Sequence, residues 1–113
     1  MSLVDVETQY AKINDDLCRG FLSHLETVGR KWNGAILLAA VRGSTRFSQY
    51  RAAIEGISDR LLAQRLRELE TEGFIERTVT PTTPVLVEYR ATDRGRELMQ
   101  LLQPLAEWGP VTR

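Results

Sequence analysis

Hydrogen-bonding side chains that could contact nucleic acid recur along residues 58–72. The segment opens on Ser58, and the groups that follow stand at spacings that place them on one side of a helix. They are Arg60, Gln64 and Arg67. Arginine can pair with guanine edges or phosphates, and glutamine can pair with adenine edges. Because Leu62, Leu66 and Leu69 fall on the other side, the pattern predicts an amphipathic helix whose polar side could contact DNA. The alternative for these polar residues is an ordinary solvated helix face.

Cys18 is the second candidate for chemistry and the only cysteine, so it cannot form an internal disulfide. That fits a reducing cytoplasm. The Asp15–Asp16 pair could cap a helix just before it, and Arg19 follows it; a helix N-terminus and a neighbouring arginine both make a thiol more reactive. We therefore consider Cys18 a candidate sensor of oxidants or electrophiles. The alternative is a small apolar side chain packed in an interface beside Leu17 and Leu22.

The sequence carries no signature of an enzyme or of a metal site. It has no glycine-rich phosphate loop and no nucleophile elbow. The single histidine, His24, lies six residues from Cys18, a spacing that does not place both on one helix face. Too few further ligands stand nearby for a metal ion. We expect no catalysis, no metal and no cofactor.

The charge composition argues partly against and partly for nucleic-acid binding. The 113 residues suit one domain, and the formal net charge is zero, which counts against a nucleic-acid-binding protein. However, residues 42–67 carry six arginines against only Glu55 and Asp59, so one basic surface can exist in a neutral protein. No apolar run approaches the roughly 20 residues that span a membrane, and residues 1–5 do not resemble a signal peptide. We expect a cytoplasmic protein without a membrane segment.

Periodicity predicts a mainly helical α+β fold with one β-hairpin. Helices are expected where apolar residues recur at helical spacing: residues 4–28, 32–41, 45–54, 58–72 and 93–109. Asn14-Asp15-Asp16 could be an N-cap that divides the first of these into a leading arm and a core helix. The segment 32–41 is mostly apolar, so it is expected to be central and buried. Thr45, Ser58 and Thr92 are the expected N-caps, and Gly73 is expected to end its helix in a left-handed conformation. Pro104 is awkward inside the last helix.

Two segments between the last two helices alternate like strands. They cover residues 75–81 and 85–92 and flank a tip fixed by Pro81 and Pro84. A helix-turn-helix followed by such a hairpin is typical of a winged-helix DNA-binding fold. The expected organisation is one winged-helix domain over residues 1–113. Its parts are an N-terminal arm at 1–17, a core at 18–92 with the helix-turn-helix at 45–72 and the wing at 75–92, and a dimerisation helix at 93–109.

A set of motifs along the chain resembles a known family. They are Gly29-Arg30-Lys31-Trp32, Gly43-Ser44-Thr45-Arg46-Phe47, Gly56-Ile57-Ser58, Leu62-x-x-x-Leu66-Arg67-Glu68-Leu69-Glu70, Gly73-Phe74-Ile75-Glu76-Arg77, Val87-Glu88-Tyr89-x-x-Thr92-x-x-Gly95 and Glu107-Trp108-Gly109. Together they resemble the HxlR-type transcriptional regulators, a branch of the MarR-like winged-helix proteins. The match runs from about Cys18 to Gly109. The sequence departs from the family at Ser44-Thr45, at the non-basic Val85-Leu86-Val87 and at Pro104.

The resemblance implies a homodimer that binds double-stranded DNA, with terminal helices forming the interface. The implied interface residues are Leu17, Phe21, Leu98, Leu101, Leu102, Leu105 and Trp108. Carried over by position, the residues expected at DNA are Ser58, Arg60, Gln64 and Arg67 on the reading helix, Arg46 and Ser48 at phosphates, and Arg77, Thr82, Thr83 and Arg90 in the wing. The resemblance also places Cys18 where family members carry a cysteine, which in some of them senses oxidants.

These observations lead to one main hypothesis and two alternatives. The main hypothesis is a sequence-specific, homodimeric transcriptional repressor that responds to oxidants or electrophiles through Cys18. One alternative is a winged-helix adaptor that binds protein, which zero net charge and the non-basic wing tip keep open. The other is a regulator that responds to a ligand without thiol sensing. The effector is not identified by the sequence.

Overall fold

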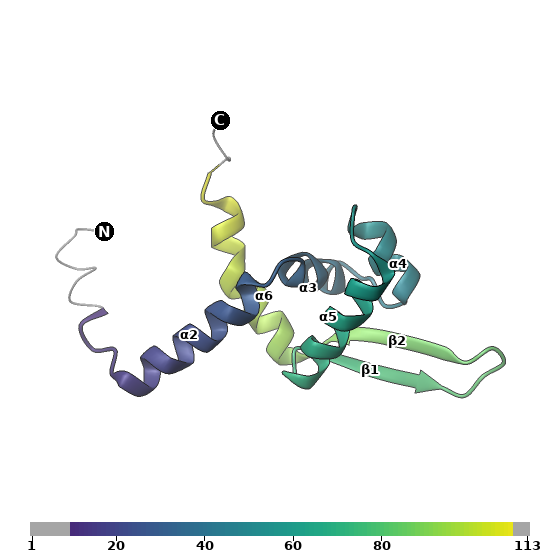
Figure 1. Ribbon diagram of the computed structural model, residues 1–113, viewed down its shortest axis with the longest axis horizontal. Helices are drawn as coiled ribbons and strands as arrows, with labels where there is room; N and C mark the ends of the chain where they lie inside the picture. The colour runs from purple at the N-terminus through teal and green to yellow at the C-terminus, as the bar shows by residue number, and fades with distance from the viewer. Residues whose placement is uncertain (1–9, 110–113) are drawn as a thin grey trace. The chain divides into compact units, whose positions relative to one another are not determined.

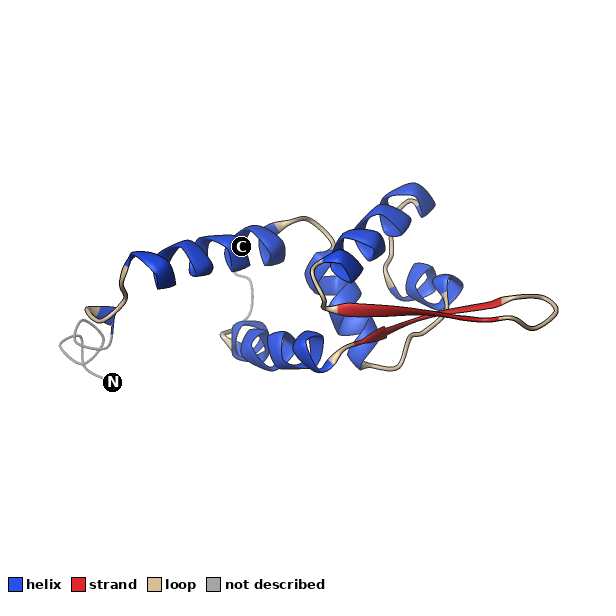
Figure 2. Ribbon diagram, turned by 90° about the horizontal axis from the view of Figure 1, so that it is seen from below, coloured by secondary structure: helices blue, strands red, loops and turns tan. Residues whose placement is uncertain are grey.

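The structure is a computed structural model and describes residues 10–109. The chain divides into two compact units with a boundary between residues 30 and 31. The first unit holds helix α2. The second holds α3, α4, α5, the strands β1 and β2, and α6, in that order (Figures 1 and 2). Their bounds are α2 Asp15–Gly29, α3 Asn33–Val41, α4 Phe47–Ala53, α5 Asp59–Thr71, β1 Ile75–Thr80, β2 Leu86–Ala91 and α6 Asp93–Glu107. The predicted order of elements and the mainly helical fold with one hairpin are confirmed.

Helix α2 begins within the apolar stripe, at the N-cap predicted at Asn14-Asp15-Asp16. Its N-cap is Asn14, whose side chain accepts a hydrogen bond from the Leu17 backbone N–H at 2.9 Å. The aspartates at 15 and 16 therefore lie in the first turn, where they complement the helix dipole, and do not cap it. The start of the expected helix, residues 4–9, lies outside the described residues. The apolar side chains Leu17, Phe21 and Leu25 are exposed.

The core of the second unit forms around α3, which packs against α4, α5, β2 and α6. Ile36 and Leu37 on α3 are fully buried, as are the three leucines predicted to face inward on α5, Leu62, Leu66 and Leu69. Burying one such side chain stabilises the fold by about 1.5–3 kcal/mol. The expectation of a central α3 is thus confirmed.

The N-cap of α4 lies one residue later than predicted. Thr45 was the expected N-cap, but Arg46 occupies that position and the helix spans Phe47–Ala53. The side-chain Oε1 of Gln49 accepts hydrogen bonds from the backbone N–H groups of Thr45, at 2.8 Å, and Arg46, at 3.0 Å. The Gln49 side chain, in the first turn, therefore reaches back to the N-cap backbone as in a capping box.

The hairpin is fixed to α4 at its base. Its strands pair antiparallel from Ile75 opposite Ala91 to Thr80 opposite Leu86. The Tyr50 hydroxyl donates to the Tyr89 carbonyl at 2.8 Å, and the Tyr89 N–H donates to the Thr45 carbonyl at 2.7 Å. Burial raises the pKa of Tyr50 to about 12, with the nearby Arg90 charge acting in the opposite direction.

The motif residues Gly73, Thr92 and Gly95 form the junction between α5, β1 and α6. Gly73 has φ +83°, as expected for a left-handed residue at the end of α5. The Thr92 hydroxyl donates to the Gly73 carbonyl at 2.6 Å and accepts from the Gly95 N–H at 3.0 Å, which confirms Thr92 as the N-cap of α6. A Cβ at Gly95 would lie 2.2 Å from the Phe74 carbonyl oxygen, so only glycine fits there.

Helix α6 continues through Pro104 to Glu107. Leu98 packs against the core, whereas Leu101, Leu105 and Trp108 are exposed. Between residues 10 and 109, no helix combines the length and the apolar character needed to cross a membrane.

Candidate nucleic-acid interface

Three of the predicted DNA-contacting residues lie together on the outer side of α5. Arg60, Gln64 and Arg67 are exposed and stand opposite the buried leucine stripe. Thr71 continues this stripe at helical spacing, is exposed, and donates from its hydroxyl to the Arg67 carbonyl at 3.0 Å. The prediction omitted Thr71, although extending the 60-64-67 spacing by four residues identifies it. We call these four residues the α5 outer stripe.

The arginines of the α5 outer stripe differ from their neighbours in charge pairing. Among residues 10–109, neither Arg60 nor Arg67 forms an ion pair. Arg51 on α4, by contrast, pairs with Asp59 on α5 at 3.1 Å and so links the two helices of the motif. Two unpaired guanidinium groups on one exposed helix face are suited to phosphates or guanine edges.

Ser58 lies at the N-terminus of α5 and caps it. Its hydroxyl oxygen accepts from the Leu61 N–H at 3.1 Å, which confirms the predicted N-cap. The residue is exposed, so its hydroxyl hydrogen remains available to a further acceptor.

The start of α4 carries two further candidates, Arg46 and Ser48, and both are exposed. The Thr45 carbonyl, just before Arg46, accepts a hydrogen bond from the Tyr89 N–H, which ties the start of α4 to strand β2.

The wing does not bring its two candidate arginines together. Arg77 pairs in register with Tyr89, and Arg90 pairs with Glu76, so Arg77 and Arg90 lie on opposite faces of the hairpin. Arg90 also forms an ion pair with Glu88 at 2.8 Å. Among the wing candidates, Arg77 is thus the more available cation.

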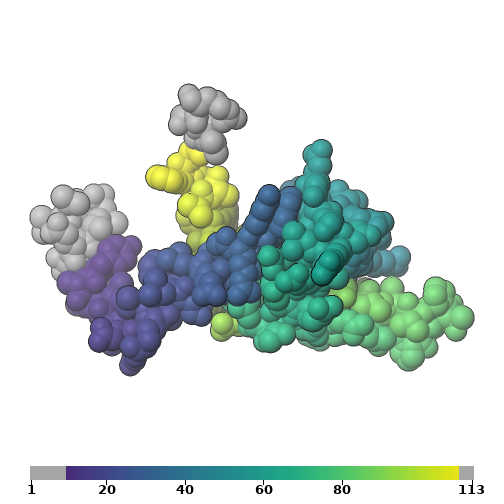
Figure 3. Space-filling view, in the orientation of Figure 1, coloured from purple at the N-terminus to yellow at the C-terminus, as the bar shows by residue number. Residues whose placement is uncertain are grey.

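The tip of the wing is exposed and carries no charged side chain between Pro81 and Val85. It stands clear of α4 and α5 in the space-filling view (Figure 3). The Thr82 hydroxyl donates to the Pro84 carbonyl at 2.8 Å, and Thr83 is exposed beside it. The candidates here are therefore neutral hydrogen-bonding groups.

Cys18 lies in the first turn of α2 and is exposed. The Arg19 guanidinium is hydrogen-bonded to the Asp16 carboxylate, so the charge expected to act on the thiol is shared with an acid.

The histidine His24 is also exposed. Within the described part of the chain, no group of three or more histidine, cysteine or acidic side chains is placed to hold a metal ion.

An open groove of about 580 Å³ lies between the base of the hairpin and the start of α6. Its arginines are already engaged. Arg90 pairs with Glu88, Arg96 pairs with Asp93, and the Arg94 guanidinium lies 4.6 Å from the centre of the Phe74 ring. Because Glu76 and Asp93 also line it, the groove presents both acids and bases and favours no single class of ligand.

The sequence and the fold are both similar to those of known proteins. Residues 27–112 match the family described as HxlR-like helix-turn-helix. A Bacillus subtilis helix-turn-helix transcriptional regulator, YvaP, is 38% identical over 93 residues, which cover 82% of this chain and 86% of that protein. Both descriptions name the helix-turn-helix, and that of YvaP names a transcriptional regulator.

Two solved structures illustrate the fold. The crystal structure of a transcriptional regulator of the MarR family from Enterococcus faecalis superposes with a TM-score of 0.76 at 30% identity, covering 87% of each chain. The redox regulator HypR in its oxidized form superposes with a TM-score of 0.74 at 34% identity, covering 83% of this chain and 97% of that one. The chain therefore has the winged-helix fold of these regulators.

Proposed function

The chain belongs to the HxlR-like helix-turn-helix family of transcriptional regulators, and from this premise we propose that it is a homodimeric, sequence-specific DNA-binding repressor of the cytoplasm. The observation that carries the proposal is the α5 outer stripe. It places an amide and two arginines, neither of which has an ion pair within residues 10–109, on one exposed face of the second motif helix. Such a helix fits the major groove, where arginine and glutamine read base edges.

The surrounding candidates supply contacts of a different kind. Arg46 and Ser48 at the start of α4, with Ser58 at the start of α5, contact phosphates and set the orientation of the reading helix. In the wing, Arg77, Thr82 and Thr83 approach the neighbouring backbone, and Arg90 contributes less because it is paired with Glu88. In this proposal residues 45–72 form the helix-turn-helix and residues 75–92 the wing.

A homodimer is supported by apolar side chains that a single chain leaves in solvent. On α6, Leu101, Leu105 and Trp108 are exposed by 71%, 64% and 83%, and on α2 Leu17 and Phe21 are exposed by more than half. Such contiguous apolar faces usually mark an interface. In the proposal both helices pair with the same elements of a second copy, and the half-buried Leu98 and Leu102 complete the α6 contribution.

Thiol sensing through Cys18 completes the proposal. The thiol is exposed and stands one residue from Leu17, inside the proposed interface. HypR, which shares the fold, is described as a redox regulator. Modification of Cys18 adds bulk or charge to the helix that pairs in the dimer, and so changes the distance between the two reading helices.

The DNA-binding test uses duplexes tiled across the region flanking the gene, with salt titrated at each. Arg67→Ala should weaken specific binding by about 1–3 kcal/mol if it reads a base. If it contacts only phosphate, it should instead weaken all duplexes alike and reduce the salt slope by about one. Arg96→Ala on α6 is the matched control and should leave affinity unchanged. Absence of salt-dependent binding to any duplex would overturn the proposal and favour the protein-binding alternative.

The thiol test repeats the titration on the preferred duplex with Cys18 free and then fully alkylated. A change of about tenfold in affinity, or 1.4 kcal/mol, is expected. Cys18→Ser treated with the same reagent should not respond. Equal affinity for free and alkylated protein would remove thiol sensing and leave a regulator that responds to another signal.

A further inference from the structure

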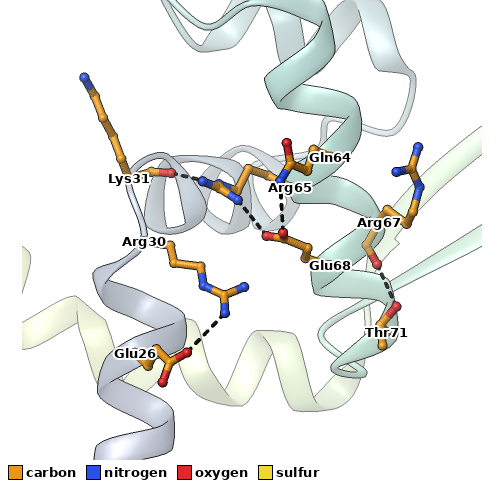
Figure 4. A network of polar contacts seen from close by, with 8 residues as sticks. All are labelled: Glu26, Arg30, Lys31, Gln64, Arg65, Arg67, Glu68 and Thr71. Atoms are coloured by element: carbon orange, nitrogen blue, oxygen red, sulfur yellow. Dashed lines mark hydrogen bonds and ion pairs between the residues drawn. The ribbon is translucent and has the colours of Figure 1, made fainter.

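A chain of hydrogen bonds connects Gln64, on the α5 outer stripe, to the backbone that precedes α3. Gln64 Nε2 donates to Glu68 Oε2 at 3.3 Å, and Arg65 Nη1 donates to Glu68 Oε1 at 2.7 Å. Arg65 Nε in turn donates to the carbonyl oxygen of Lys31 at 3.4 Å. Figure 4 shows the two carboxylate oxygens of Glu68 divided between Gln64 and Arg65.

The members of this chain differ in exposure. The side chains of Arg65 and Glu68 are 18% and 29% exposed, whereas Gln64 is exposed. The half-buried pair therefore lies beside the outer stripe and not on it. Because Arg65 also contacts a backbone atom outside α5, the position of the Glu68 carboxylate is set from beyond its own helix.

Hydrogen-bond chemistry fixes the direction of the Gln64 amide. An ionised carboxylate only accepts hydrogen bonds, so Gln64 must present its NH₂ group to Glu68. Its carbonyl oxygen and its second N–H are left to face outward. An acceptor beside a donor is the complement of the adenine edge, which offers the N6 amino group and the N7 acceptor in the major groove.

We propose that Gln64 reads an adenine in the major groove, and that Glu68 and Arg65 are positioning residues that hold its amide in the required direction. This inference rests on the proposed DNA-binding function of α5. It separates the outer stripe into two kinds of residue. Gln64 is held before DNA arrives, so less side-chain freedom is lost on binding. Arg60 and Arg67 have no ion pair within residues 10–109, so their side chains remain free to adjust to phosphate or guanine.

The alternative for Arg65 and Glu68 is a helix-surface ion pair without influence on DNA. Pairs three residues apart on a helix are common and contribute only to helix stability. The two interpretations differ in one measurable quantity, which is base preference at a single position. A purely structural pair changes the thermal midpoint and overall affinity but not the preference for one base over the other three.

The experiment starts from the preferred duplex of the wild-type protein and replaces each of its A·T pairs in turn by the other three base pairs. At one A·T position the replacement should weaken wild-type binding about tenfold or more. Gln64→Ala should no longer show this penalty, the loss of affinity at that one position. It should still lose affinity when the base pairs read by other residues are replaced. Glu68→Gln replaces an acceptor-only group by one that can also donate, so the Gln64 amide is no longer directed. It should reduce the same penalty to about two- to threefold. Glu70→Gln, on an exposed position of the same helix, is the matched control and should leave it unchanged.

Arg65→Lys provides a second variant if Glu68→Gln fails to fold. A lysine keeps the charge beside Glu68 but cannot also donate a fixed second bond to the Lys31 carbonyl. It should lose part of the penalty at the same base pair with the thermal midpoint nearly unchanged.

The outcomes distinguish the inference from the proposed function. Specific binding by the wild type with full base preference retained in Gln64→Ala would overturn the adenine assignment. Loss of preference in Gln64→Ala but not in Glu68→Gln or Arg65→Lys would overturn the positioning role. A wild-type protein that prefers no sequence would overturn the DNA-reading function itself, and the inference with it.

Discussion

Two helices of this protein carry apolar residues at the same spacing, but one apolar face is buried and the other is exposed. On α5, Leu62, Leu66 and Leu69 are fully buried against α3 and the hairpin base. On the second half of α6, Leu101, Leu105 and Trp108 recur at similar intervals but are mostly exposed. Periodicity thus identifies which side of a helix is apolar, whereas the position of the helix in the fold decides what covers that side.

The comparison has a functional meaning. The buried face of α5 fixes the opposite face, the α5 outer stripe, toward solvent, where DNA can be contacted. The exposed face of α6 is left for a second copy in the proposed dimer. In the proposed dimer, one apolar stripe builds the core of each chain and the other packs against the second copy.

The largest effect is expected at the buried face. Leu66→Ala removes a fully buried side chain and leaves a cavity, so it should lower the free energy of unfolding by about 2–5 kcal/mol. Urea denaturation monitored by circular dichroism measures this change. A loss below 1 kcal/mol would mean that the α5 stripe is not packed as described.

A smaller effect, and one of a different kind, is expected at the exposed face. Leu105→Ala should weaken self-association by about 1.5–3 kcal/mol, because the leucine is buried only in the dimer. Sedimentation over a range of concentrations measures the dissociation constant, and Gln103→Ala, at an exposed polar position of the same helix, is the control. A protein that is monomeric at all concentrations, or a dimer indifferent to Leu105, would contradict the assigned interface.

The smallest effect is expected at Tyr50, which ties the buried core to the wing. Tyr50→Phe removes the hydrogen bond to the Tyr89 carbonyl and should cost about 0.5–1.5 kcal/mol. The pKa of Tyr50 is raised in the fold from 10.0 to about 12, so the folded state holds this proton more tightly than the unfolded chain. Its contribution to stability is therefore complete below pH 10 and is lost as the pH rises toward 12.

Denaturation of both proteins between pH 8 and about 12 tests this contribution. The wild type should lose stability more steeply than Tyr50→Phe over the upper half of that range. Parallel curves for the two proteins would show that the tyrosine proton is not held by the fold.

Local chemistry explains which features could be predicted from the sequence. Ser58 and Thr92 cap their helices as expected, and Gly73 is left-handed, because each depends on a residue's own side chain and its nearest neighbours. The expected Thr45 cap was wrong because Arg46 is the N-cap, and the Thr45 hydroxyl donates to Gln49 Oε1 at 3.2 Å and does not accept from the first turn.

Features that depend on tertiary contacts were not predictable in the same way. The hydrogen bond from Arg65 to the Lys31 carbonyl joins residues 34 positions apart, and no spacing pattern in the sequence predicts it. Opposite placement of Arg77 and Arg90 follows only from the strand register. Thr71, by contrast, was within reach of the sequence, since it extends a helical spacing already recognised.

The central claim is that a symmetric dimer presents two copies of α5 to DNA. Selection from a random duplex library with the wild-type protein tests it most directly. The account predicts an enriched sequence with two-fold symmetry, whose half-sites are separated by about 10 base pairs or a whole multiple of one helical turn. Enrichment of a single unrepeated half-site, or no enrichment at all, would contradict it.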